Sequence, residues 1–393
     1  MNRESYLDEL KQALQGYPEE LTGDLLESFA SHFAEGNAMG LTDQQIIDEL
    51  GSIDEVVSSV SEMGEKNPED RNEATSLKDI IIKTIRESVV HRYGDSAYRV
   101  RTEKGQQSED TIAIPEGYRG VLVDSSKVAL DLTVEASDQL SYSFTAYKNL
   151  ISGYQPELSV SFNENVIIFK IEKQSERMAG SCELDLRIPQ AIRDLFVNTA
   201  SGDTSVRDLR LEEFVCHCAA GDTDITDCDI DKLTVRAVSG DVRLENVESR
   251  NFDISSVSGD VSLSGCTGAV TVNSVSGDVE VEDHIGSLLA SEAVSGDINV
   301  AGSLEEVRIK AINGDSEIVL ENDPVNVDIK ASNGDICLEV TDFTRCRMEI
   351  SANHGDVSLP EEVSFRKSGR TYIAGEGSGI ITIKSGNGDI TIR

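Results

Sequence analysis

Apolar and polar residues alternate in short runs along the C-terminal half of the chain, and Gly-Asp pairs interrupt these runs. In "FDISSVSGDVSL" (Phe252–Leu263), apolar side chains stand seven and five residues before Gly259 and two and four residues after it. The same spacing places Leu233 and Val235 before Gly240. Alternation with a period of two predicts short β-strands that bury one face.

The Gly-Asp pairs recur at a nearly constant interval. Successive aspartates are 18 to 21 residues apart from Asp203 to Asp356, and the last gap, to Asp389, is 33 residues. A fixed period of this length predicts a stacked repeat architecture, with each rung formed by a strand, a corner, a second strand and a return. We therefore predict an all-β, β-helix-like β-solenoid of about ten rungs, one for each Gly-Asp pair.

Each Gly-Asp pair fits a tight corner, because glycine accepts a positive φ and Asp accepts hydrogen bonds from nearby backbone amides. We interpret the following as structural turn residues: Gly202, Asp203, Gly221, Asp222, Gly240, Asp241, Gly259, Asp260, Gly277, Asp278, Gly296, Asp297, Gly314, Asp315, Gly334, Asp335, Gly355, Asp356, Gly388 and Asp389. A column of stacked carboxylates could instead hold cations such as Ca²⁺. Calcium-binding β-rolls use longer Gly-Gly-x-Gly-x-Asp runs, so we favour turns and predict no metal site.

The first 66 residues follow a helical pattern, with apolar residues at helical intervals from Leu7 to Val60. Capping boxes at Thr42 with Gln45 and at Ser52 with Glu55 mark two helix starts. We predict four segments: a small all-α bundle over 1–66, a linker and connecting helix over 67–94, a strand-rich capping region over 95–190 and the solenoid over 191–393.

Two interpretations remain for the stretch Ser76–Arg92 within the connecting segment. The favoured one is a connecting helix that docks on a neighbouring domain. The other is a helix lying in a membrane interface, since Lys78, Lys83, Arg86 and Arg92 follow its polar side.

The C-terminus raises the question of open sheet edges. The long gap before Asp389 contains "LPEEVSFRKSGRTYIAGEGSG", which we expect to cover an edge. The chain then ends on "GDITIR", and a terminal strand with nothing after it predicts an edge available for self-association.

Charge narrows the classes of partner. The chain carries 72 acidic and 35 basic residues, a net charge of −37, which repels nucleic acid and anionic membrane surfaces. We find no signal-peptide-like segment, no apolar run long enough to span a membrane and no regular spacing of the seven cysteines. We expect a cytoplasmic protein.

The remaining chemistry-bearing residues favour a structural interpretation. Cys216, His217, Cys218 and Cys228 could be zinc ligands. However, Cys216 and Cys218 fall at inward positions, so we favour buried core cysteines and expect His217, of opposite parity, to point outward. The sequence has no nucleophilic triad, phosphate-binding loop or nucleotide fingerprint, so we predict a non-enzymatic protein without cofactors.

The repeats "TASGDTSV", "VSGDVRL", "NGDICL" and "NGDITIR" resemble the bacterial putative-adhesin β-strand-repeat family, whose function is unknown. The lead-in "LDLRIPQAIRDLFVNTASGD" is similar to that family's approach to its first corner. This resemblance covers residues 95–393 and implies a β-strand-repeat fold.

The N-terminal unit resembles the HAAS domain, a helical signalling domain associated with helix-turn-helix proteins. The matching stretches are "YLDELKQAL" (Tyr6–Leu14), "HFAEGNAMGLTDQQIIDELGS" (His32–Ser52) and "IDEVVSSV" (Ile53–Val60). The resemblance implies partnership with a PadR-type transcription regulator. Candidate docking residues are the carboxylates Glu35, Asp43, Asp48, Glu49 and Asp54.

These observations lead to one hypothesis and one alternative. The hypothesis is a cytoplasmic signalling protein whose helical domain docks the regulator and whose solenoid is a sensory or scaffold module. The alternative is a cell-surface or envelope protein with an adhesin-like binding function.

Overall fold

The computed structural model describes residues 5–7, 11–12, 97–99, 107–147, 155–163, 165–173, 181–322, 326–341, 346–361, 364–375 and 377–393. Residues 5–7 and 11–12 are helical. The rest of the predicted helical bundle and the connecting segment up to residue 94 lie outside the described residues. No described helix is long and apolar enough to cross a membrane.

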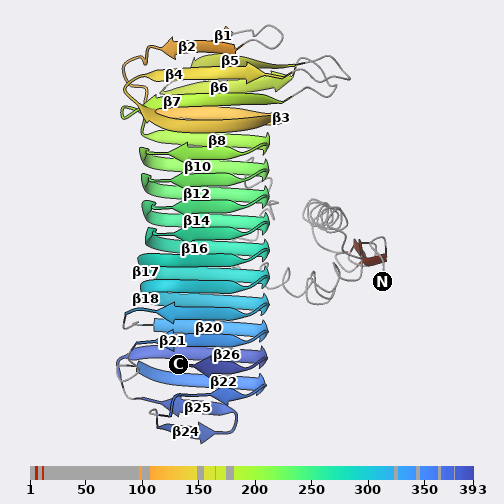
Figure 1. The fold of residues 1–393 in the computed structure, drawn as a ribbon, viewed down its shortest axis with the longest axis vertical. Helices are drawn as coiled ribbons and strands as arrows, with labels where there is room; N and C mark the ends of the chain where they lie inside the picture. Colours follow the sequence, from red (N-terminus) through yellow and green to blue (C-terminus); the bar gives the residue numbers. More distant parts are fainter. Residues whose placement is uncertain are drawn as a thin grey trace, which may run out of the picture.

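Within these ranges, 27 strands form one continuous sheet that winds into a tall column, as Figure 1 shows. At one end lies a cap of seven strands: β1 (Ala97–Arg99), β2 (Gln107–Ile112), β3 (Gly120–Ser137), β4 (Leu140–Ala146), β5 (Pro156–Asn163), β6 (Val166–Lys173) and β7 (Cys182–Pro189). The 18-residue strand β3 connects the cap to the column, because it pairs in parallel with β6 and β7 on one side and with β8 and β9 on the other.

The column begins with alternating longer and shorter strands: β8 (Asp194–Ser201), β9 (Thr204–Arg207), β10 (Arg210–Ala220), β11 (Thr223–Thr226), β12 (Asp229–Ser239), β13 (Val242–Glu245), β14 (Glu248–Ser258), β15 (Val261–Ser264) and β16 (Thr267–Ser276). Each long strand pairs in parallel with the next long strand, and each short strand with the next short one. Phe214 is thus in register with Leu233, and Leu233 with Phe252. This parallel stacking is the arrangement that the constant repeat length predicts.

The column continues through β17 (Val279–Ser295), β18 (Ile298–Asn313), β19 (Ser316–Leu320), β20 (Asn326–Asn333), β21 (Ile336–Val340), β22 (Cys346–His354), β23 (Val357–Ser358), β26 (Gly379–Asn387) and β27 (Ile390–Ile392). The hairpin of β24 (Phe365–Ser368) and β25 (Thr371–Ala374) closes its lower end in Figure 1.

The inward positions form the core. Phe252, Ile254, Val261 and Leu263 are each at most 1% exposed, as the alternation around Gly259 predicts. The small residue three positions before each corner glycine is also buried. Where it is serine, its hydroxyl bonds to the corner, as Ser256 Oγ donates to the Gly259 carbonyl at 3.2 Å. Aligned columns of apolar side chains therefore run along the axis and hold successive coils together.

The corner at Gly259 explains why glycine recurs there. Its φ is 129°, and a Cβ added to it would stand 2.3 Å from the Gly240 carbonyl oxygen of the preceding coil. The backbones of successive corners lie too close for any side chain. The requirement comes from stacking as much as from the turn.

The prediction of an open edge at the last strand is wrong. Strand β27 pairs with β21 on one side and with β23 on the other, and β26 lies between β20 and β22. The chain first places β22 and β23 one position further along the column, and then returns to fill the intervening space. The segment between β23 and β26 does cover an edge, because its strand β25 pairs antiparallel with β22.

We predict that Gly259→Ala lowers the free energy of unfolding by about 2–5 kcal/mol, because it combines a positive φ with overpacking against a neighbouring backbone. Gly369→Ala is the matched control, since Gly369 has a φ of 66° but nothing within 4 Å of an added Cβ. We expect the control to lose only about 1 kcal/mol. Urea denaturation followed by circular dichroism measures both, and equal losses would contradict the stacking explanation.

Candidate functional site

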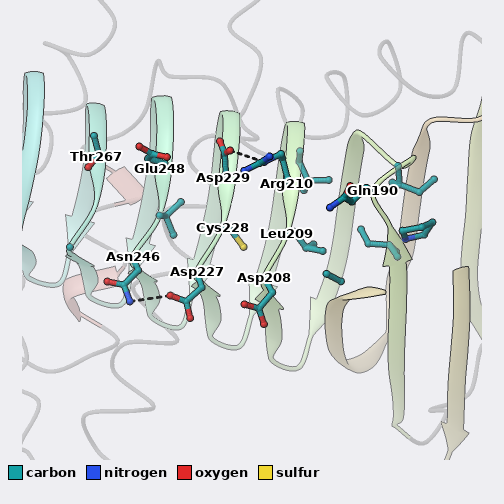
Figure 2. Close-up of a pocket in the computed structure, with 17 residues that line it drawn as sticks. Gln190, Asp208, Leu209, Arg210, Asp227, Cys228, Asp229, Asn246, Glu248 and Thr267 are labelled. Carbon is teal, nitrogen blue, oxygen red and sulfur yellow. Dashed lines mark hydrogen bonds and ion pairs between the residues drawn. The ribbon is translucent and has the colours of Figure 1, made fainter. Parts of the chain in front are cut away.

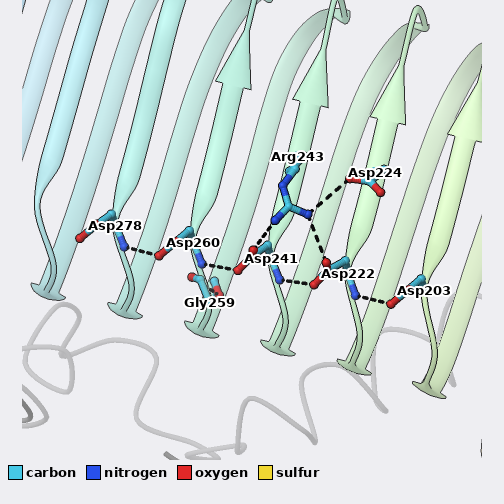
Figure 3. Close-up of polar contacts among 9 residues, drawn as sticks. Asp203, Asp222, Asp224, Asp241, Arg243, Gly259, Asp260 and Asp278 are labelled. Atoms are coloured by element: carbon cyan, nitrogen blue, oxygen red, sulfur yellow. Dashed lines mark hydrogen bonds and ion pairs between the residues drawn. The ribbon is translucent and has the colours of Figure 1, made fainter. Parts of the chain in front are cut away.

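A ladder of aspartates runs along the Gly-Asp edge of the column. In each coil the Asp Oδ1 accepts the backbone N–H of the Asp in the next coil, as from Asp241 to Asp222 at 2.9 Å and from Asp260 to Asp241 at 3.0 Å (Figure 3). The ladder begins in the cap, where Asp131 accepts the N–H of Asp203 at 3.2 Å. It includes all ten aspartates of the repeated pairs, with Asp389 placed between Asp335 and Asp356.

One cation interrupts this acidic edge. Arg243 donates to Asp222 at 3.1 Å and also binds Asp241, while Asp224 lies 3.8 Å from the same guanidinium (Figure 3). The hydrogen bond to Asp222 is the main cause that raises the pKa of Arg243. Within the described residues, no group of three or more His, Cys, Asp or Glu side chains is arranged to hold a metal ion. Each of these carboxylates accepts a hydrogen bond from the corner of the neighbouring coil, so the ladder links coils to one another.

A second corner column follows the short strands, and the sequence reasoning missed it. Asp208, Asp227, Asn246 and Asp283 adopt φ values of 50–58°. Asp and Asn tolerate this left-handed conformation better than other residues with side chains. The signal was present in the sequence, because each of these residues stands six positions after a corner glycine. Gly265 takes the equivalent position, six residues after Gly259, and also has a positive φ.

A groove of about 600 Å³ lies beside this second column (Figure 2). Asp208, Asp227 and Asn246 form one wall, and Asn246 Nδ2 donates to Asp227 Oδ1 at 3.1 Å. Arg210, whose guanidinium lies 2.9 Å from Asp229, lines the opposite wall with Glu248 and Gln190. The carboxylates outnumber the single, already paired cation, so the groove disfavours anionic ligands.

The cysteines belong to the core. Cys216, Cys218 and Cys228 are at most 3% exposed, and Cys228 Sγ donates to the Thr226 carbonyl at 3.2 Å. Burial raises the pKa of the Cys228 thiol to about 11 and also raises that of Cys216. Buried, protonated thiols act as small apolar side chains, which confirms the core interpretation.

His217 differs from its expected setting. It has outward parity between Asn198 and Arg236 of the neighbouring coils, yet it is only 5% exposed. Burial, together with the positive charge of Arg236, lowers its pKa to about 4. Parity gives the direction of a side chain relative to the sheet, but it does not give the cover that neighbouring side chains provide.

The candidate docking residues Glu35, Asp43, Asp48, Glu49 and Asp54 all lie outside the described residues. Their role stays a prediction from the resemblance of the N-terminal unit.

Comparison with protein families decides the fold family. A family model described as Toastrack DUF4097 matches residues 110–305 and 292–393. The chain belongs to the Toastrack family. A HAAS model matches residues 5–59, so both resemblances found in the sequence are confirmed. No curated protein matches the chain.

Solved structures similar to this chain have low identity to it. A putative adhesin from Parabacteroides distasonis is 13% identical, covering 74% of this chain and 97% of its own, with a TM-score of 0.38. A putative lipid binding protein from the same organism is 12% identical, covering 75% and 98%, with a TM-score of 0.38. A putative cell adhesion protein from Clostridium sporogenes is 11% identical, covering 74% and 99%, with a TM-score of 0.22.

For the Asp ladder of the Toastrack column, we predict that Asp260→Ala lowers the free energy of unfolding by about 1 kcal/mol, because the N–H of Asp278 loses its acceptor. Asp260→Asn keeps an acceptor oxygen and removes one charge from a line of like charges. We expect it to match or exceed the stability of the wild type at low salt. Thermal melts of both variants at low and high salt provide the measurement, and identical losses would refute the ladder bond.

His217 gives the Toastrack column a pH dependence with a defined sign. The unfolded chain binds a proton below a pKa of about 6.5, whereas folded His217 binds it only near 4. The histidine therefore lowers the free energy of unfolding as pH falls from about 6.5 to 4, by roughly 3 kcal/mol at most. Above pH 6.5 it has no such effect.

His217→Asn removes this titration and introduces the residue type that Asn198 supplies at the same position one coil earlier. Urea unfolding at pH 7 and pH 4.5 gives the free energy of unfolding of the wild type and the variant. We expect the wild-type value minus the variant value to be smaller at pH 4.5 than at pH 7. A difference that is independent of pH would show that His217 is not protected from protonation.

Proposed function

We propose that the protein is a non-enzymatic, cytoplasmic signalling protein in which the HAAS region docks a PadR-type transcription regulator and the Toastrack column serves as a sensory or scaffold module. The observation that carries the proposal is the match of residues 5–59 to the HAAS family in the same chain as a Toastrack domain. A HAAS domain implies a regulator as partner.

The charge of the N-terminal region supports a basic protein surface as the docking site. Residues 1–66 contain fifteen carboxylates and three cations, a net charge of −12. A regulator that binds DNA carries basic surface for the phosphate backbone. Opposite charge speeds the encounter of two proteins and selects against wrong partners. The regulator's DNA-contacting surface is therefore the docking surface that we propose.

The architecture of the column supports a scaffold role. Hydrogen bonds between successive corner aspartates continue from Asp131 in the cap to Asp356 in the last coil. Inside the column, the buried residues Phe214, Leu233 and Phe252 stack in register in successive coils. Such a column resists bending, because each coil is bonded to its neighbours along the whole length. It would therefore hold an attached domain at a set distance. A sensory role would use the groove beside Asp208 and Asp227.

The cytoplasmic location is part of the proposal and separates it from the alternative of a surface or envelope protein with an adhesin-like role. Cell fractionation with an antibody against the chain tests it. Recovery of the protein in the soluble cytoplasmic fraction supports the signalling role, and recovery in the envelope favours the alternative.

The docking prediction concerns the full chain and a PadR-type regulator from the same organism, measured by calorimetry at low salt. Five carboxylates are changed to their amides: Glu35, Asp43, Asp48, Glu49 and Asp54. An exposed ion pair contributes about 0.2–1 kcal/mol, so the loss of five should weaken binding by roughly fivefold to a few thousandfold.

The matched control makes the same change of net charge on exposed residues of the column: Glu245, Glu280, Glu282, Glu317 and Glu339, each changed to Gln. We expect it to bind nearly as well as the wild type. No binding by the wild type, or equal weakening in both variants, would contradict docking through the HAAS region.

A further inference from the structure

Edge strands of opposite charge lie at the two ends of the column, β24 at one end and β2 in the cap, where β1 is a second edge strand that pairs only with β5. At the lower end in Figure 1, β24 pairs only with β25, and all four of its residues are exposed. At the cap end, β2 pairs only with β4. Each strand therefore has one edge whose backbone groups have no partner strand within the described residues, and such an edge is a template for a further strand.

The lower end is basic and has an aromatic surface. The hairpin from Phe365 to Ala374 contains Arg366, Lys367 and Arg370 and no carboxylate, in a chain whose net charge is −37. Neither Arg366 nor Arg370 forms an ion pair with a described residue. Phe365, 48% exposed, is among the few large apolar side chains in contact with solvent in the described ranges.

The side chains of this hairpin support one another. The rings of Phe365 and Tyr372 are 5.4 Å apart, and Lys367 Nζ lies 4.5 Å above the Tyr372 ring while donating to its hydroxyl. The basic groups are thus presented on an ordered strand.

The cap end has the complementary charge. Strand β2, "QSEDTI", carries Glu109 and Asp110, both exposed, and no cation. Asp110 is opposite Tyr142 of β4, whose side chain is buried, so the carboxylate stands on the core side of the sheet. An inward charge on an edge strand hinders the addition of a further strand, so a strand that pairs with β2 must supply the opposite charge.

We propose that the protein associates head to tail, with the basic edge strand β24 of one copy docking on the acidic edge strand β2 of the next. Two basic ends repel each other, as do two acidic ends, because like charges on facing strands are unfavourable. Only the unlike contact attracts. End-to-end docking also keeps the acidic sides of the two columns far apart.

This contact is heterologous, so each added copy leaves a new basic end and a new acidic end free, and short linear assemblies result. The inference concerns the column alone and does not depend on the proposed docking of a regulator. The occupant is a second copy of this chain because its own far end supplies the complementary charge.

Sedimentation velocity on the full chain tests the proposal. At about 0.01 M ionic strength, where the Debye length is about 30 Å, the weight-average mass should rise with protein concentration. At about 1 M, where it is about 3 Å, the mass should return to that of one chain. A wild type that stays monomeric at low salt would overturn the proposal.

Two charge-reversal variants identify the contact. One carries Arg366→Glu with Lys367→Glu, and the other carries Glu109→Lys with Asp110→Lys. All four positions are exposed, and a thermal melt of each variant checks that it folds, because Lys367→Glu also removes the contact with Tyr372. Each variant has two ends of the same sign and should stay monomeric alone. Mixing the two should restore association, since each then offers the end that the other lacks.

The mixture also excludes other occupants of the basic end. If the acidic N-terminal region were the partner, only the variant reversed at β24 would lose association, which would overturn the assignment to β2. Association that persists unchanged in both variants would overturn the role of the two edges. An additional variant, Phe365→Ser, should weaken association without changing its dependence on salt.

Discussion

Stacking in register is the constraint on which this structure depends. Each coil must follow the backbone path of the coil beside it, because the strands of the column bond to the corresponding strands of the neighbouring coils. At the Gly-Asp edge this brings the carbonyl of Gly240 to 2.3 Å from the place where a Cβ on Gly259 would stand. The glycines, the carboxylate ladder and the aligned core columns are all consequences of that single requirement, and none would be needed in an isolated hairpin.

The periodicity of the sequence was sufficient to predict the strands of the column, the Gly-Asp corners and the buried positions, because all three repeat with the coil. It was not sufficient where the structure departs from repetition. Insertion of β26 and β27 between earlier strands leaves only a longer gap before Asp389, which is equally compatible with a simple loop. The burial of His217 was also missed, because parity does not report how neighbouring side chains cover an outward residue.

The second corner column shows a different limit. Asp208, Asp227, Asn246 and Gly265 perform the same conformational task with three residue types, so no fixed motif marks the position. The groove beside them could not be found before the coils were stacked, because each of its walls is assembled from residues of successive coils, such as Asp208, Asp227 and Asn246, which are 19 positions apart in the sequence. The second corner column is recognised only when the repeats are aligned by backbone position instead of by residue identity.

The late placement of β26 and β27 has a consequence for biosynthesis. Coils that stack in sequence order can assemble as the ribosome releases them, each on a finished template. The coil formed by β22 and β23 has no such template, because the strands that separate it from β20 and β21 are made after it. The coil of β22 and β23 therefore joins the column only after β26 and β27 have been synthesised, and a nascent chain stopped short of residue 379 holds one coil that lacks its neighbour.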